Sequence, residues 1–234
     1  MKVVLSPSKS MSENTKTPLQ TPLFDKRFEL LKGLQNMSVS SLMTLYQSNE
    51  KIATENYKRF NKFEEKNQAI FTYTGQQFKH LDVATLEQVS IDHLNEVLYI
   101  MSGLYGLVRP YDKIGLYRLP MGVKWNDAPL KNEWVDLISD HLKPYEVLNL
   151  ASKEYYDAID HKRVDVTRVD FLVEKNGKIR KAPAMEAKKM RGLMLRKIAE
   201  NKLNNIELVK SIKFNDYSYD NSRSKKGVIT FLKQ

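Results

Sequence analysis

The sequence predicts a single mixed α/β domain over residues 1–234, with a mixed sheet flanked by helices. Three observations lead to this fold class. Short apolar runs, typical of buried strands, alternate with stretches of helical periodicity. The 234 residues are 41% apolar, which is enough for one substantial core. No internal repeat, low-complexity tract or linker divides the chain.

The first third of the chain starts with a strand and continues with helices. Residues 2–5 (KVVL) are a strand candidate, and Pro7 ends it. A polar, proline-punctuated loop then leads to three predicted helices, at residues 24–35, 40–46 and 49–63. Ser48 or Asn49 can cap the third of them. The last two helices therefore form a helix, tight turn, helix arrangement.

Two more strand candidates lie in the middle of the chain, at residues 68–73 (QAIFTY) and 97–101 (VLYIM). Between them, Thr85 and Gln88 have capping-box spacing, so a short helix is predicted to begin near Leu86.

The segment at residues 102–122, SGLYGLVRPYDKIGLYRLPMG, follows the second of these strands. Its glycines and prolines exclude a long helix and indicate a shaped loop. A loop leaving a buried strand often carries a site, although a connection whose arginines are paired for structural reasons remains the alternative.

The last hundred residues continue the alternation of strands and helices. Asn176 and Gly177 give the strongest hairpin signal in the chain. Pro183 precedes a long predicted helix with an apolar stripe and a basic far side. In order, the predicted elements are a helix at 130–142, a strand at 147–150, a hairpin within 164–180, a helix at 184–203, a polar loop at 216–226 and a strand at 227–232.

Charge is unevenly distributed along the chain. The net charge is +10, and residues 161–234 hold 19 Lys and Arg against 8 Asp and Glu, whereas the first 160 residues are nearly neutral. A basic C-terminal third favours a polyanionic partner, nucleic acid more often than a membrane, although excess lysine also serves solubility.

The chain has no cysteine, no apolar run long enough to span a membrane and no secretory core at its start. These features exclude thiolate catalysis and predict a cytoplasmic protein, which we expect to be a monomer. His80, His93, His141 and His161 lie far apart without metal-ligand spacing, so we predict no metal and no cofactor.

Basic residues on three segments are candidate contacts to nucleic acid. The helix pair at residues 40–63 most resembles a helix-hairpin-helix, but the Gly-apolar-Gly hairpin of that motif is missing, and an ordinary packed helix pair is the alternative. The long helix at 184–203 is expected to present a continuous basic face. The predicted contacts are Lys51, Lys58, Arg59, Lys62, Lys188, Lys189, Arg191, Arg196, Arg223, Lys225 and Lys226.

Polar groups at strand ends and helix starts indicate a cleft that binds an anion. Its predicted members are Ser6, Lys9, Arg109, Arg118, Asn149, Ser152, Lys188 and Arg191. We expect Arg109, Asp112 and Arg118 in its interior and the basic helix and tail at its rim. If the cleft is catalytic, Asp112 or Glu154 could act as base and Lys9 or Tyr117 as acid, with the arginines clamping the anion. No nucleophile can be assigned.

Several of these segments together resemble the YaaA family of bacterial peroxide stress proteins, and the similarity runs end to end. The matching motifs are SPSK at residues 6–9, FTYTG at 71–75, MSGLYGLVRPYDKIGLYRLPMG at 101–122, NLASKEY at 149–155, AKKMRGLM at 187–194, and the tail motifs FNDYSYD and GVITFLK. The chain departs from the family pattern at Gln76, where an aspartate is common, and at Asp216, where a glycine is common. The first departure weakens any catalytic role that needs a carboxylate there.

The resemblance implies a compact family-specific fold with a positively charged cleft, a helix-hairpin-helix element and binding to duplex DNA. It also implies a role in limiting intracellular iron and oxidative DNA damage under hydrogen peroxide. We therefore favour a DNA-binding stress protein that contacts phosphates. An enzyme acting on a nucleotide or another phosphorylated small molecule is the alternative.

Overall fold

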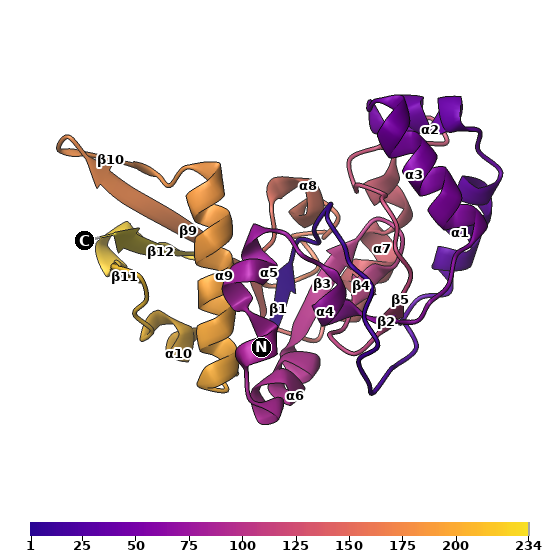
Figure 1. Ribbon diagram of the computed structural model, residues 1–234. Helices are drawn as coiled ribbons and strands as arrows, with labels where there is room; N and C mark the ends of the chain where they lie inside the picture. The colour runs from indigo at the N-terminus through magenta and orange to yellow at the C-terminus, as the bar shows by residue number, and fades with distance from the viewer. Residues whose placement is uncertain (234) are drawn as a thin grey trace.

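A mixed sheet of eight strands runs through the molecule, and the computed structural model describes residues 1–233 (Figure 1). The sheet order is β11–β12–β9–β8–β1–β3–β4, with β10 paired to β9. Neighbours from β12 to β3 are parallel, while β4, β10 and β11 pair antiparallel. The strands are β1 Lys2–Leu5, β3 Leu98–Ser102, β4 Gly106–Val108, β8 Val147–Leu150, β9 Val166–Lys175, β10 Lys178–Lys181, β11 Tyr217–Tyr219 and β12 Val228–Lys233.

The strands β1, β3 and β8 form the centre of the sheet. Every residue of β3 and β8 is buried, as are three of the four residues of β1. A parallel strand covered on both faces has a continuous apolar sequence, which is why these strands could be predicted. Two short ladders lie outside the main sheet, formed by β2 Asn67–Gln68 with β5 Lys113–Ile114 and by β6 Lys124–Trp125 with β7 Ala128–Pro129.

Helices flank the sheet and share its core, so the predicted single α/β domain is confirmed. The helices α1, α2 and α3 gather at one end of the molecule, at the upper right of Figure 1, and α9 runs along the other side. The helices are α1 Lys26–Gln35, α2 Val39–Tyr46, α3 Glu50–Asn61, α4 Ala69–Thr72, α5 Gln76–Leu81, α6 Gln88–Val97, α7 Val135–Leu142, α8 Lys153–Tyr156, α9 Ala184–Glu200 and α10 Ile206–Lys210. Short 3₁₀ turns lie at Val83–Thr85, Leu130–Glu133 and Asn221–Arg223.

The helices α5 and α9 pack very closely at Gly192. A Cβ atom at this position would lie 2.1 Å from the carbonyl oxygen of Gln77, so only glycine allows this approach. Met190, Met194 and Ile198 of α9 are fully buried. These contacts fix α9, and the residues near its start, relative to the first turn of α5.

The prediction of a strand over residues 68–73 is wrong. Asn67–Gln68 forms a two-residue strand, α4 follows at once, and Tyr73 makes an isolated bridge with Met11. The amides of Ala69 and Ile70 donate to the carbonyls of Asp112 and Pro110, at 3.0 Å each. Thr72 donates its hydroxyl to the carbonyl of Gln68 at 2.8 Å, one helical turn back. A short apolar run does not distinguish a strand from a buried helical turn, and here contacts with the 102–122 segment decide.

Other helix starts also differ from the prediction. Thr85 does not cap the helix α6, because its hydroxyl donates to Asp82, and α6 begins at Gln88 without a side-chain cap. The predicted helix at 130–142 is a 3₁₀ turn followed by α7 from Val135. In contrast, Asn49 caps α3 as expected, accepting from the amide of Ile52 at 3.1 Å.

The predicted hairpin within residues 164–180 is confirmed. Asn176 and Gly177 form its turn with φ angles of 55° and 69°, and β9 and β10 flank it. The predicted polar loop at 216–226 instead contains β11 and a 3₁₀ turn. No helix within residues 1–233 is both long enough and apolar enough to cross a membrane.

Candidate functional site

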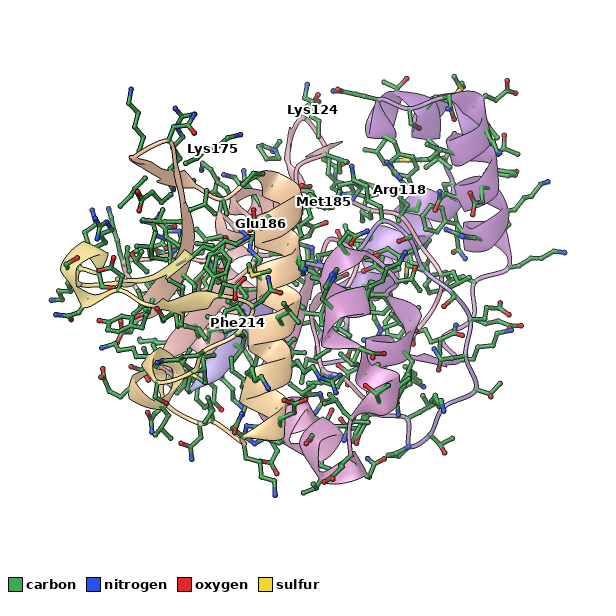
Figure 2. All side chains as sticks on the ribbon, turned by 60° about the vertical axis from the view of Figure 1, so that its left-hand side comes forward. Arg118, Lys124, Lys175, Met185, Glu186 and Phe214 are labelled. Atoms are coloured by element: carbon green, nitrogen blue, oxygen red, sulfur yellow. The ribbon has the colours of Figure 1, made fainter. Side chains whose placement is uncertain are left out.

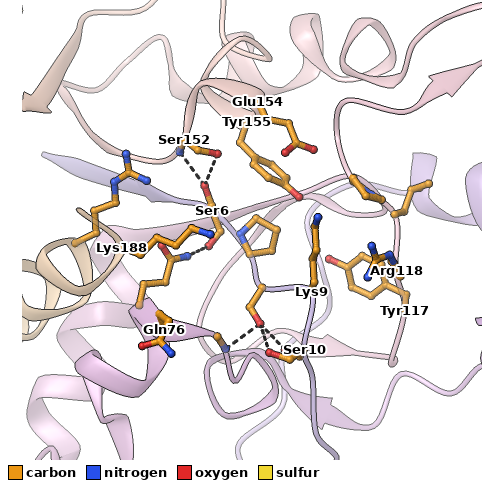
Figure 3. Close-up of a pocket in the computed structure, with 17 residues that line it drawn as sticks. Ser6, Lys9, Ser10, Gln76, Tyr117, Arg118, Ser152, Glu154, Tyr155 and Lys188 are labelled. Carbon is orange, nitrogen blue, oxygen red and sulfur yellow. Dashed lines mark hydrogen bonds between the residues drawn. The ribbon is translucent and has the colours of Figure 1, made fainter. Parts of the chain in front are cut away.

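A pocket of about 370 Å³ opens at the carboxyl ends of β1 and β8 (Figure 3). The carboxyl edge of a parallel sheet is the usual place for a ligand site, because several chain segments leave the sheet there together. The segments after β1 and β8 supply part of the lining, together with the start of α5, the 102–122 segment and α9. The lining residues are Ser6, Pro7, Ser8, Lys9, Ser10, Gly75, Gln76, Gln77, Tyr117, Arg118, Leu119, Pro120, Ser152, Glu154, Tyr155, Lys188 and Arg191.

The turn after β1 is fixed on two sides by hydroxyl groups. The buried Ser6 accepts from the amide of Ser152 at 2.8 Å, which joins this turn to the start of α8. Ser8 accepts from the amide of Gly75 at 2.9 Å, which joins it to the start of α5. Gln77 donates its side-chain amide to the carbonyl of Ser6. The SPSK sequence is therefore held in place as part of the pocket wall.

Four cationic side chains reach the pocket, and one carboxylate accompanies them. The cations are Lys9, Arg118, Lys188 and Arg191, and the carboxylate is Glu154. Figure 3 shows Lys188 and Arg118 on opposite sides, with Lys9 between them. Glu154 accepts from the amide of Gly122 at 3.2 Å and is exposed at the rim. The pocket interior is therefore strongly positive, as an anion site requires.

The two pocket arginines differ from the other buried arginines of the protein. Within residues 1–233, Arg118 and Arg191 are the only buried or half-buried arginines that make no ion pair. Burial lowers the pKa of Arg191, with Asp170 opposing that shift. The Nε atom of Arg118 is buried and has no hydrogen-bond partner among these residues. A buried cationic donor without a partner is costly, so both groups have unused capacity for an anion.

The family follows from comparison with known proteins. A family model described as peroxide stress protein YaaA matches residues 1–223. The chain belongs to the YaaA family. Curated relatives called UPF0246 proteins cover all of this chain: one from Francisella philomiragia is 34% identical over 100% of both chains, and one from Finegoldia magna is 32% identical over 98% of its own length. A third relative, from Marinomonas sp., is 33% identical over 97% of its length.

The resemblance to the YaaA family is thus confirmed, and its motifs can be placed in the fold. Residues of SPSK, FTYTG, NLASKEY, AKKMRGLM and the long central motif all line the pocket. Gln76, where this chain departs from the family pattern, is among them. Its amide side chain adds no charge to the pocket.

Tyr117 lines the pocket but its hydroxyl is already engaged. It bonds to the hydroxyl of Tyr73 at 2.8 Å and to that of Ser102 at 2.6 Å. Burial raises the pKa of Tyr117 to about 12. A phenol with this pKa stays protonated near neutral pH and is a weak proton donor, which makes Tyr117 a poor general acid.

The prediction that Arg109 and Asp112 share the interior of the cleft with Arg118 is wrong. Asp112 is fully buried, and it accepts from the amide of Arg109 at 2.8 Å and from its Nε at 3.0 Å. Arg109 also donates to the carbonyl of Thr21 at 2.7 Å. The two residues form a closed corner that joins the 102–122 segment to the loop before α1, outside the pocket lining.

Of the other predicted cleft residues, Ser6, Ser152 and Lys188 do line the pocket, and Asn149 does not. Asn149 accepts from the amide of Ala151 at 2.8 Å and shapes the turn beneath the pocket. Sequence reasoning missed Gln77 and Tyr155. The FTYTG motif pointed to the start of α5, but no local pattern marks Gln77 as a pocket residue.

The predicted continuous basic face of α9 is also wrong. Arg196 turns away from solvent and donates to the carbonyl of Leu81 and to Thr85, at 2.9 Å each, while its Nε pairs with Glu200. Lys188 and Arg191 face the pocket, and Lys189 lies beside a separate hollow near His80. The helix packs on more than one side, so its basic residues are divided among different surroundings.

The remaining candidate contacts to nucleic acid lie on two other surfaces. In the α2–α3 pair, Gln47 has left-handed backbone geometry, and its amide and that of Ser48 already donate to α2 carbonyls. The hairpin amides are thus occupied. On α3, Arg59 pairs with Glu55, and Lys51 and Lys58 are exposed, as is Lys62 just after the helix. Near the C-terminus, Arg223 pairs with Asp220, while exposed Lys225 and Lys226 border a hollow beside α10.

Within residues 1–233 no three His, Asp or Glu side chains gather as a metal site would require.

Proposed function

We propose that this member of the peroxide stress family is a cytoplasmic protein that binds duplex DNA, largely through phosphate contacts centred on the cationic pocket. The observation that carries the proposal is the convergence of Lys9, Arg118, Lys188 and Arg191 on one opening with a single carboxylate beside them. Guanidinium and ammonium groups without counter-ions are the groups that bind phosphate in proteins. The net charge of +10 adds long-range attraction to a polyanion.

A salt-dependent titration tests this proposal. A fluorescein-labelled duplex is titrated with the protein at several salt concentrations, and its anisotropy gives the binding constant. We expect log K to fall with log salt by about 0.9 per phosphate contacted, and little dependence on base sequence. The pocket variant, with Lys188 and Arg191 changed to Ala, should bind more weakly with a shallower slope. A double variant of exposed lysines away from the pocket, Lys32→Ala with Lys143→Ala, is the control. Salt-independent binding, or equal affinity for the pocket variant, would overturn the proposal.

The proposal includes a role in limiting intracellular iron and the DNA damage that iron causes under hydrogen peroxide. Complementation of a deletion strain tests this role by measuring survival and free intracellular iron after peroxide. The wild type should restore both, and Arg118→Ala should not. If Arg118→Ala restores both fully, the pocket is not required for this role.

A second candidate function is favoured by the shape of the pocket. Arg118 and Arg191 are half-buried within a recess of about 370 Å³. Recesses of roughly 300–1,000 Å³ usually bind small ligands, whereas a duplex needs an open surface. A nucleotide or another phosphorylated small molecule is therefore the alternative ligand, with Glu154 and Lys9 as its candidate base and acid.

A thermal-shift screen separates the two candidates. Nucleotides and phosphorylated metabolites at millimolar concentration should raise the melting temperature if the pocket binds a small ligand, because a ligand that binds only the folded state stabilises it. Arg118→Ala should remove the shift. A screen without any shift, beside tight and salt-dependent DNA binding, would exclude the small-ligand function.

A further inference from the structure

The strand β9 extends two residues past its pairing with β12. Its first residues pair with β8 and its middle residues pair with β12 as far as Val173. Within residues 1–233, Glu174 and Lys175 pair only with β10. The end of β9, the Asn176–Gly177 turn and β10 therefore form a two-stranded ribbon that stands out from the body (Figure 1).

This ribbon is strongly basic. Residues 174–181 read EKNGKIRK, with four cations and one acid. Lys175, Lys178 and Arg180 are exposed and make no ion pair within residues 1–233, while Lys181 approaches Asp170 at 3.7 Å. Figure 2 shows Lys175 at the far end of the ribbon, away from the sheet.

The pairing of the ribbon places like charges together. Lys175 and Lys178 are direct cross-strand partners on either side of the turn. Like charges opposite each other destabilise an antiparallel pair. Ile179 is the only apolar residue in this stretch and is half-buried, so core burial does little to offset the repulsion. An anionic partner lying across the tip would neutralise the repulsion between Lys175 and Lys178.

The chain also links the ribbon to the pocket. From β10 it passes through Ala182 and Pro183 directly into α9, whose first eight residues include Lys188 and Arg191. Seven cations thus lie between residues 175 and 191 on consecutive elements. Glu186, the one acid of the helix start, is engaged by Tyr217 at 3.1 Å and Lys233 at 3.3 Å.

We propose that the β9–β10 ribbon is a DNA-binding arm that contacts the groove and backbone of the same duplex whose phosphates reach the pocket. This inference rests on the proposed DNA-binding function. A two-stranded antiparallel ribbon fits the major groove of B-DNA, which is about 12 Å wide. The lysines at the tip then face the phosphates on either side of that groove.

Removing the paired charges tests the arm. In Lys175→Gln with Lys178→Gln, the slope of log K against log salt should become less negative by about 1.8, and affinity at moderate salt should fall by about tenfold or more. The variant should melt at the same temperature as the wild type or higher, because the Lys–Lys repulsion is gone.

The control is Lys32→Gln with Lys143→Gln, which should keep the wild-type slope. If the ribbon variant binds like this control, the ribbon does not contact DNA, while the proposed DNA binding by the pocket stands. If the wild type itself does not bind, the proposed function fails first.

A label on the ribbon locates the contact directly. The chain has no cysteine, so Glu174→Cys gives one attachment point for an environment-sensitive fluorophore on the ribbon, and Gln35→Cys gives a matched one on α1. Duplex DNA should change the emission of the ribbon label and leave the α1 label unchanged. Vesicles of phosphatidylglycerol are added to separate samples. A response to vesicles but not to duplex, or equal responses at both labels, would overturn the proposal.

Discussion

Arg109 and Arg118 lie nine residues apart in the 102–122 segment and have opposite surroundings. Arg109 pairs with the buried Asp112 and also donates to the carbonyl of Thr21. Arg118 reaches the pocket, makes no ion pair within residues 1–233 and leaves its buried Nε without a partner. The same side chain thus closes a structural corner in one place and faces an open recess in the other.

This difference separates a structural arginine from a ligand-binding one. A buried arginine whose hydrogen bonds are all made within the chain stabilises the fold and has little left to offer a ligand. A half-buried arginine without a counter-ion is retained at an electrostatic cost, and binding an anion offsets that cost. Variants of the two regions should therefore differ in what they lose, stability in one and ligand affinity in the other.

The largest effect is expected at the closed corner. Asp112→Ala leaves the amide and guanidinium of Arg109 without their acceptor in a buried site, so the free energy of unfolding should fall by about 3–5 kcal/mol. Urea denaturation measures this loss. Binding of phosphate or DNA by the folded variant should stay close to wild type. A variant that is fully stable but has lost binding would reverse our assignment of the two regions.

The corner should also make stability depend on pH. Burial raises the pKa of Asp112 to about 6, against the lowering effect of Arg109. In the unfolded chain this carboxyl titrates near its ordinary value, so between about pH 4 and 6 the folded state holds the proton more tightly. Stability should therefore fall as pH rises through this window, by about 3 kcal/mol in total from this group.

Comparing the wild type with Asp112→Asn isolates this contribution. Urea denaturation of both proteins from pH 4 to 7 gives the difference in unfolding free energy at each pH. An identical pH dependence for the two proteins would mean that Asp112 titrates at its ordinary pKa.

A smaller effect, on binding and not on folding, is expected at the open recess. Arg118→Gln removes a charged donor from the pocket, so affinity for the anionic ligand should fall by about 10–100-fold, as for the loss of one charge-assisted hydrogen bond. Unfolding free energy should change by less than about 1 kcal/mol, because no ion pair is broken. The same two measurements on Arg109→Gln should give the opposite pattern, and matching patterns for the two variants would contradict the comparison.

The smallest effect is expected beneath Arg118. Its guanidinium lies 6.0 Å from the centre of the Tyr46 ring, and the buried hydroxyl of Tyr46 has no partner within residues 1–233. Tyr46→Phe removes an unsatisfied polar group and keeps the ring, so stability should rise by about 1 kcal/mol. Thermal denaturation checks this change. A loss of stability would show that the hydroxyl is bonded in solution, and a loss of ligand affinity would show that it belongs to the pocket.

Local sequence predicted the fold well where one short stretch contains all the information. The central strands β1, β3 and β8 read as apolar runs because both of their faces are covered. The Asn176–Gly177 turn was predicted because few residues accept positive φ angles at both positions. At residues 68–73 the prediction failed, since contacts with the distant 102–122 segment set the backbone there.

The candidate site was predicted in part. The motifs after β1 and at the start of α8 marked strand ends, where polar side chains gather, and Lys188 and Arg191 were expected beside them. The division between Arg109 and Arg118 was not visible, because both arginines belong to one polar loop in the sequence. The division of the α9 cations also depends on which neighbour covers each side of that helix, and only the packing against α5 shows it.

The sequence by itself therefore determined the α/β class, the central strands, the hairpin, the family and the excess of positive charge. Each of these follows from residues close together in the chain or from composition. Only the tertiary structure decided which cations meet in the pocket and which are neutralised elsewhere. The physical reason is that a charge acts on its neighbours in space, and Lys9, Arg118 and Arg191 become neighbours only when β1, the central loop and α9 are brought together by the core.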